Sequence, residues 1–153
     1  LALIPGETRE AALADFAARY ADEPLVLDKW FAIQAQIPET GTLERITRLQ
    51  EHPAFTLTNP NRVRALIGSF AFGNPTQFAR ADGAGFSCVA RTVAVLDATN
   101  PQVAARMLTA FGSWRRLEKS RAAKAAEMLN GIKAIPGLSR DTADILARTL
   151  QGG

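Results

Sequence analysis

The sequence is poor in the residues on which disulfides, metal sites and many catalytic centres depend. Its 153 residues include one cysteine, Cys88, and one histidine, His52. A single cysteine excludes a disulfide within the chain, and the apolar segment around Cys88 predicts a small core residue. One histidine and one cysteine cannot supply the three or four ligands of a zinc site. The same lack argues against a Ser-His-Asp triad.

Other signatures of catalysis and targeting are also missing. No His-Glu-x-x-His motif occurs, and the glycine-rich stretch Asp82-Gly83-Ala84-Gly85 follows no predicted strand. That stretch therefore predicts a tightly packed helix start and not a phosphate-binding loop. No run reaches the ~20 apolar residues of a membrane span, and no signal peptide is visible. The first residue is Leu1 and not methionine, so we expect a piece of a longer protein. Because these motifs are missing, we do not expect a self-contained catalyst.

The rest of the composition is typical of a soluble globular protein. Hydrophobic residues make up 47% of the chain and charged residues 22%. The length suits one domain, and we expect it to extend over residues 1–153. A net charge of +3 is weak evidence for a nucleic-acid partner, and the mixed charges of RRLEKSRAAKAAE indicate a solvated helix face. We expect neither a nucleic acid nor a membrane as partner.

Helical spacing of apolar residues dominates the chain. Thr8 and Ser139 are candidate N-caps, Gly131 is a candidate helix stop, and Trp30 and Phe31 are expected in the core. The predicted helices cover residues 8–20, 24–36, 43–50, 60–70, a single turn to 78, a stretch after Gly83 through 96, 101–114, 118–130 and 140–150.

A repeat runs through these helices. Pro24, Pro60 and Pro101 each begin a helix, at separations of 36 and 41 residues, and the last helix begins near Arg140, 39 residues on. Two helices per period of this length are typical of helical solenoids, in which each pair buries its apolar face against its neighbours. The sequence thus predicts an all-α, right-handed superhelix of antiparallel helix pairs (armadillo/HEAT-like) with about eight helices. The alternative is an irregular helical bundle whose prolines coincide by chance.

Two helix starts are closely alike: TNPNRVRALIGSF at 58–70 and NPQVAARMLTAF at 100–111. In both, asparagine is a good N-cap and proline loses nothing at the first helical position. Each helix also has an apolar stripe at helical spacing that should face the core. The two stripes are Val63, Leu66, Ile67 and Phe70 in the first helix and Val103, Met107, Leu108 and Phe111 in the second.

The opposite faces carry an arginine in comparable places. Asn61, Arg64 and Gly68 share one face, and Gln102, Arg106 and Thr109 share the other. Equivalent helices of a solenoid line one surface, so on a concave surface Arg64 and Arg106 would converge on one hollow. Two guanidinium groups there suit carboxylates, including the C-terminus of a peptide. The alternative is that both arginines merely solvate an outer face.

Four segments carry a family resemblance. They are LVLDKWFAIQA, FTLTNPNRVRALIGSFAFGNP, DGAGF and NPQVAARM, in that order and spacing. Together they closely resemble the C-terminal helical domain of bacterial aminopeptidase N, the zinc-dependent alanyl aminopeptidase. The resemblance extends from roughly Tyr20 to Leu150, and the first twenty residues match less distinctly.

The resemblance implies a function that this chain serves only as part of a larger enzyme. In that family the helical domain covers a thermolysin-like catalytic domain, which holds the zinc and the general-base glutamate, and encloses a cavity over the metal. The enzyme removes N-terminal residues from peptides in the bacterial cytoplasm. By this resemblance Arg64, Arg106 and Gln102 face the cavity, and the two arginines can meet the far end of the peptide. The chain alone is expected to have no catalytic residue and to bind no zinc.

Two rival readings differ in function class. The chain could be a free-standing HEAT-like module that binds a protein or a nucleic acid along its concave face. It could also be a structural cap in which neither arginine touches a ligand.

Overall fold

The computed structural model describes residues 3–152, which fold into helices without any strand. Two compact units divide the chain, Leu1–Gln77 and Phe78–Gly153. The all-helical class is therefore confirmed for the described residues. Within the same range, no helix is both long enough and apolar enough to cross a bilayer.

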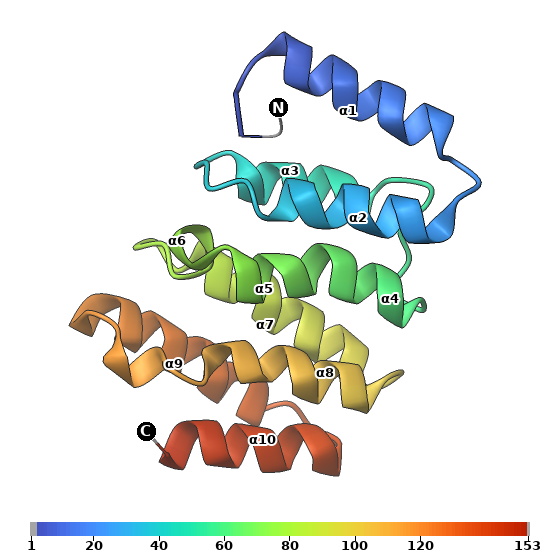
Figure 1. The fold of residues 1–153 in the computed structure, drawn as a ribbon. Coiled ribbons are helices and arrows are strands. Elements are labelled where there is room, and N and C mark those ends of the chain that lie inside the picture. The colour runs from blue at the N-terminus through green and yellow to red at the C-terminus, as the bar shows by residue number, and fades with distance from the viewer. Residues whose placement is uncertain (1–2, 153) are drawn as a thin grey trace. The chain divides into compact units, whose positions relative to one another are not determined.

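The first unit contains α1 (Glu7–Arg19), α2 (Pro24–Ala35), α3 (Thr42–Gln50), α4 (Pro60–Val63) and α5 (Ser69–Gly73). Between α4 and α5 lies a turn of π-helix, Arg64–Gly68, whose backbone stays in the right-handed helical region at both junctions. Residues 60–73 are therefore one continuous helix, hereafter the α4–α5 helix. It packs beside α2, which also packs against α3 and α1 (Figure 1). A short helix, α6 (Pro75–Phe78), stands at the boundary of the units.

The second unit contains α7 (Ala84–Asp97), α8 (Pro101–Leu108), α9 (Lys119–Lys133) and α10 (Arg140–Gln151). Two 3₁₀ turns, Thr109–Phe111 and Trp114–Arg116, connect α8 to α9. α8 packs against both α7 and α10, and α9 packs against the same two helices. The short connection after α7 makes α7 and α8 neighbours in sequence and in space (Figure 1).

The helix starts predicted from the repeat are confirmed. The helices begin at Pro24, Pro60, Pro101 and Arg140, as the repeat requires. Asn59 Oδ1 accepts hydrogen bonds from the backbone N–H groups of Asn61 (3.0 Å) and Arg62 (3.3 Å). Asn100 Oδ1 and Ser139 Oγ likewise accept from backbone N–H groups three residues on, at 3.3 and 3.2 Å. These side chains pair first-turn donors that no helical carbonyl can reach.

Two predicted boundaries at Thr8 and Gly131 are wrong. α1 begins at Glu7, and Gly6, with φ 137°, turns the chain into it without a side-chain cap. Thr8 therefore lies inside the helix. α9 runs through Gly131 to Lys133, because Gly131 does not adopt the left-handed backbone with which a glycine ends a helix.

The helix from Pro101 is also shorter than predicted. It ends as an α-helix at Leu108 and tightens into a 3₁₀ turn, well before Trp114. Thr109 Oγ1 donates a 2.6 Å hydrogen bond to the Arg106 carbonyl, which competes with the next turn of α-helix. The predicted core residue Phe111 nevertheless stays buried, since the tight turn still carries it inward.

The predicted apolar stripes form the core. Trp30 and Phe31 are buried, and Trp30 Nε1 donates to the Leu13 carbonyl at 2.8 Å, which ties α1 to α2. Cys88 is a buried free thiol. The following apolar residues of the α4–α5 helix, α7 and α8 are buried as well: Val63, Leu66, Ile67, Phe70, Phe86, Val89, Ala90, Val93, Leu96, Val103, Met107 and Leu108.

The Asp82-Gly83 stretch begins α7, as predicted. Gly83 adopts φ 76°, and a Cβ there would lie 2.9 Å from the Lys124 side chain, so both the backbone and the packing require glycine. Asp82 Oδ1 accepts a hydrogen bond from the backbone N–H of Ala84 at 3.0 Å. This local chemistry is a helix start and not a phosphate loop.

Asn74 closes the end of α2. Its side chain is buried, and Nδ2 donates to the carbonyls of Ala35 (3.0 Å) and Ile37 (2.8 Å). Carbonyls at a helix C-terminus have no intrahelical partner. A residue 39 positions away thus completes the hydrogen bonding of α2 and fixes the end of the α4–α5 helix against it.

A charge network joins α1 to the α2–α3 pair. Arg9 is buried and binds the Glu39 carboxylate through two nitrogens, at 2.7 and 3.1 Å. Glu10 accepts from Arg9 Nε at 3.0 Å and from both terminal nitrogens of Arg45, at 2.9 and 2.5 Å. Arg45 also donates to Gln34 Oε1 at 3.1 Å. These hydrogen bonds lower the pKa of Glu10 to about 2, those from Arg45 most strongly.

In the second unit, Asp97 holds the start of α10. Its two carboxylate oxygens accept hydrogen bonds from the backbone N–H of Ser139 (2.7 Å) and from Ser139 Oγ (2.5 Å). Burial raises the pKa of Asp97, but these hydrogen bonds more than offset it, so the pKa lies below its ordinary value. The end of α7 and the N-cap of α10 are thereby joined.

We expect Asn74→Ala to lower the free energy of unfolding by about 1 to 3 kcal/mol, because it leaves the buried Ala35 carbonyl at the end of α2 without its donor. Urea denaturation followed by circular dichroism would measure the loss. Thr76→Ala is the matched control, since its exposed hydroxyl only donates to Asn74 Oδ1 at 3.3 Å. Equal stability of the two variants would show that Asn74 does not hold α2.

We also expect stability to fall as the pH drops from about 4.5 toward 2, because Glu10 must then take up a proton that its folded environment disfavours. The Glu10 side chain is 49% exposed, so solvent screening limits this contribution to about 1 kcal/mol. The contribution is fully present above the unfolded pKa, near 4.5, and Glu10→Gln should remove it. Urea titrations across this range test the prediction, with Glu44→Gln as a control that breaks no ion pair.

Candidate functional site

Arg64 is the first residue of the π-helical turn and is exposed. Its Nη1 donates a 3.0 Å hydrogen bond to Asn61 Oδ1, one turn earlier. Among the described residues it forms no ion pair. The guanidinium is therefore oriented by a neutral neighbour, and its charge remains available to an anion from outside.

Arg62, only two positions earlier, has the opposite environment. It is 5% exposed and forms an ion pair with Asp28 of α2, with 3.1 Å between Nη1 and Oδ1. Its guanidinium also lies over the Phe31 ring, 5.1 Å from the ring centroid. A buried charge needs such compensation. The two arginines of the NRVR segment thus divide into an inward structural residue and an outward candidate binding residue.

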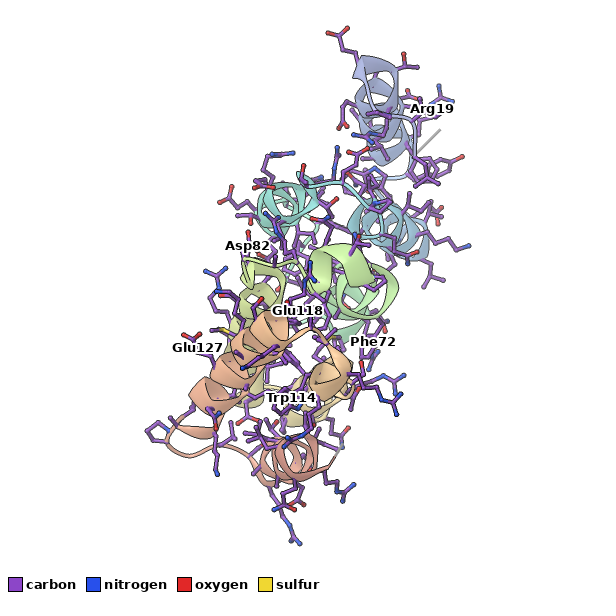
Figure 2. The ribbon with its side chains drawn as sticks, turned by 90° about the vertical axis from the view of Figure 1, so that its left-hand side faces the viewer. Arg19, Phe72, Asp82, Trp114, Glu118 and Glu127 are labelled. Atoms are coloured by element: carbon purple, nitrogen blue, oxygen red, sulfur yellow. The ribbon has the colours of Figure 1, made fainter. Side chains whose placement is uncertain are left out.

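The π-helical turn changes which residues share a face with Arg64. In an α-helix, residues seven apart nearly complete two turns, and a π-turn adds one residue to the count. Phe72, eight positions after Arg64, therefore lies on the same face. Its side chain, labelled in Figure 2, is 53% exposed. Gly68 was predicted on the exposed polar face, but it is buried, because this wide turn packs against α2. Single π-turns recur at functional sites.

Gln102 and Arg106 lie one turn apart on α8, and both are exposed. Residues four apart on a helix are surface neighbours, so the structure brings these two predicted residues together. Arg106, like Arg64, forms no ion pair within residues 3–152. Thr109, also predicted on this face, is exposed. Arg64 belongs to the other unit, so its convergence with Arg106 stays a prediction.

Both candidate helices lie in stretches without acidic residues. No aspartate or glutamate occurs from His52 to Ala81, nor from Ala98 to Leu117. The exposed arginines of these stretches consequently have no carboxylate on their own helix that could neutralise them. This arrangement produces a locally positive potential that favours an anionic group.

Two hollows lie elsewhere, one in each unit, and neither includes Arg64, Gln102 or Arg106. An open hollow of 670 Å³ in the first unit is lined by residues of α1, α2 and the loop after α3. Its lining is mostly apolar, and His52 is its single titratable side chain. His52 Nδ1 accepts from the backbone N–H of Ala54 at 3.1 Å. A smaller hollow of 260 Å³ lies between the ends of α9 and α10. Neither combines groups that could carry out acid–base chemistry.

The described residues do not fit a metal site. In residues 3–152, no three histidine, cysteine, aspartate or glutamate side chains gather closely enough to hold an ion. His52 stands among aromatic rings, 5.2 Å from Trp30 and 5.7 Å from Phe31 between ring centroids.

Sequence reasoning missed the Arg9–Glu10–Glu39–Arg45 network and the exposure of Phe72. The network depends on pairs 30 and 35 residues apart, for which a single sequence holds no signal. In the sequence Phe72 stands out only as part of a family motif, and an α-helical count places it away from Arg64.

Comparisons with known proteins identify a family and several relatives of this chain. Residues 1–151 match a family described as a domain of unknown function (DUF3458_C) with ARM repeats. Aminopeptidase N of Caulobacter vibrioides is 41% identical over 95% of the chain, that of Haemophilus influenzae 36% over 94%, and that of Escherichia coli 34% over 93%. The chain spans only 16 to 17% of the length of these relatives.

A solved structure supports the same assignment. Legionella pneumophila aminopeptidase A, in complex with aspartic acid, superimposes with a TM-score of 0.88 at 33% identity, over 94% of this chain and 17% of that one. The ARM-repeat description also confirms the predicted class of helical repeats. The chain therefore belongs to the family of ARM-repeat domains (DUF3458_C) that forms the C-terminal helical part of bacterial aminopeptidase N.

Proposed function

We propose that this chain is the C-terminal domain of a zinc-dependent aminopeptidase that removes N-terminal residues from peptides in the bacterial cytoplasm. In this proposal residues 1–153 act as one helical-repeat domain that encloses the active-site cavity. The catalytic part of the same protein is its partner. Membership of the family and similarity to three proteins named aminopeptidase N support the proposal.

The observation that carries the proposal is the pair of exposed arginines without ion pairs on acid-free helices. Arg64 and Arg106 are free to bind the terminal carboxylate of a peptide whose other end is being cleaved. A planar guanidinium suits a carboxylate because two of its N–H groups can donate in parallel. Gln102, one turn from Arg106, would supply a neutral amide to the peptide backbone.

The zinc belongs to the part of the enzyme outside residues 3–152 in this proposal, since those residues do not fit a metal site. When bound there, zinc polarises the scissile carbonyl and activates water. The contribution of this chain is to bind and orient the far end of the substrate. If the chain has that role, substitution of the arginines should weaken the binding of peptides long enough to reach them. The cleavage of shorter substrates should not change.

We expect Arg64→Ala and Arg106→Ala in the full-length enzyme to raise KM for peptides with a free C-terminal carboxylate by about three- to tenfold each. The estimate reflects a partly screened contact of about 1 kcal/mol. Hydrolysis of alanine p-nitroanilide, which has no distant carboxylate, should not change. Steady-state kinetics on peptides with free and with amidated C-termini would measure the difference.

Arg91→Gln is the matched control, because Arg91 is an exposed arginine of α7 without an ion pair. If the Arg64 and Arg106 variants behave like Arg91→Gln with every peptide, the arginines do not bind substrate. The domain would then serve only as a structural cap.

The chain produced alone should cleave no peptide and bind no zinc at stoichiometric level, since the proposal assigns both properties to the rest of the enzyme. Peptidase assays and metal analysis after dialysis test this expectation. One tightly bound zinc ion per chain would contradict it. Binding of DNA that weakens steeply with salt would instead favour a free-standing nucleic-acid module.

A further inference from the structure

Two half-exposed apolar side chains lie near the C-terminal ends of α2 and α5 in the first unit. Ile33 of α2 is 49% exposed and Phe72 of α5 is 53% exposed. Side chains of this size gain free energy when they are covered. Neither is required to fill the core, which the buried faces of the same helices already form.

The packing register places Ile33 and Phe72 at the same end of two neighbouring helices. α2 and the α4–α5 helix run in the same direction, because Asp28 pairs with Arg62 near their starts and Asn74 binds the Ala35 carbonyl at their ends. A Cβ on Gly73 would lie 3.1 Å from the Gln36 side chain. Ile33 is one turn before Gln36, and Phe72 immediately precedes Gly73.

Cationic side chains accompany these apolar ones. Lys29, one turn before Ile33, is exposed, as is Arg64. The only acidic residue of the two helices is Asp28, which is already paired with Arg62. We call Lys29, Ile33, Arg64 and Phe72 the α2–α5 strip. Its composition complements a ligand that is apolar at one end and anionic at the other.

We propose that the α2–α5 strip binds the C-terminal segment of a peptide substrate, with the terminal carboxylate at Arg64 and an upstream apolar side chain between Ile33 and Phe72. The proposal rests on the proposed function and adds a preference for sequence far from the scissile bond. Charge complementarity favours this anionic occupant over a basic or wholly apolar surface of another part of the protein.

The spacing of the strip fixes which peptide residue it selects. Because of the π-turn, Arg64 and Phe72 are two turns apart, or about 11 Å along the helix axis. An extended peptide covers about 3.3 Å per residue, so the apolar side chain lies about three to four residues before the carboxylate. The hydrogen bond to Asn61 directs the Arg64 guanidinium away from Phe72. The distance between the guanidinium and the Phe72 ring is therefore longer, and not shorter, than the axial separation. A leucine at the C-terminal position itself should therefore gain little.

The test uses the full-length enzyme and serine–alanine peptides of one length, in which a single leucine moves from position to position toward the C-terminus. KM should be lowest, by about three- to tenfold, with leucine about three to four residues before the carboxylate. Phe72→Gln and Ile33→Gln should each abolish this optimum. Val95→Gln is the matched control, because Val95 of α7 is 56% exposed and lies outside the strip.

Three outcomes would overturn the inference. The optimum could be absent in the unsubstituted enzyme, or it could persist in both strip variants. The variants could also lower the melting temperature without altering peptide preference, which would show that the rest of the enzyme covers the strip. Cleavage of alanine p-nitroanilide separates these failures from the failure of the proposed function. If the unsubstituted full-length protein does not cleave that substrate, both proposals fall.

Discussion

The parallel packing of α2 against the α4–α5 helix determines which side chains of the first unit reach solvent. The register is fixed at both ends, by the Asp28–Arg62 ion pair and by the hydrogen bonds from Asn74 to the carbonyls of Ala35 and Ile37. Both sets of polar groups are largely buried. If one helix shifted by one residue against the other, these charges and carbonyls would lose their partners, and the fold would lose several kcal/mol of stability. The exposed positions follow from that constraint.

Between these fixed ends, the π-turn accommodates one residue more than an α-helix would hold. The added residue leaves the buried stripe of Val63, Leu66, Ile67 and Phe70 intact. It rotates the C-terminal turn so that Phe72 follows Arg64 on the outer face and Gly68 turns inward. A local irregularity thus converts a polar face into one that combines charge with an aromatic ring.

Helix starts could be predicted from the sequence because they depend on local chemistry. In an Asn-Pro pair, asparagine is the N-cap and proline is the first helical residue, so two adjacent residues predict where the helix begins. All the helix starts expected from the repeat are found. Helix ends and interior irregularities depend on tertiary contacts. Nothing in the neighbouring sequence shows that α9 continues through Gly131 and does not end there. Likewise, nothing near Arg64 distinguishes a π-helical turn from a regular α-helical one.

The candidate site shows the same division. Exposure of Arg64, Gln102 and Arg106 followed from helical spacing, because each lies opposite an apolar stripe. The convergence of Arg64 with Arg106 could not be settled by periodicity, since it depends on the relation between two compact units. The network around Arg9 escaped prediction because its partners lie 30 or more residues away.

The two arginines of NRVR explain why a motif alone could not assign a binding residue. Arg62 has its charge compensated by Asp28 and its plane covered by Phe31, so its interactions are already committed to the fold. Arg64 makes one hydrogen bond to a neutral side chain and remains exposed, so it contributes little to folding. An arginine that stabilises nothing by itself, on a helix without acidic residues, can still gain free energy by meeting a carboxylate from outside.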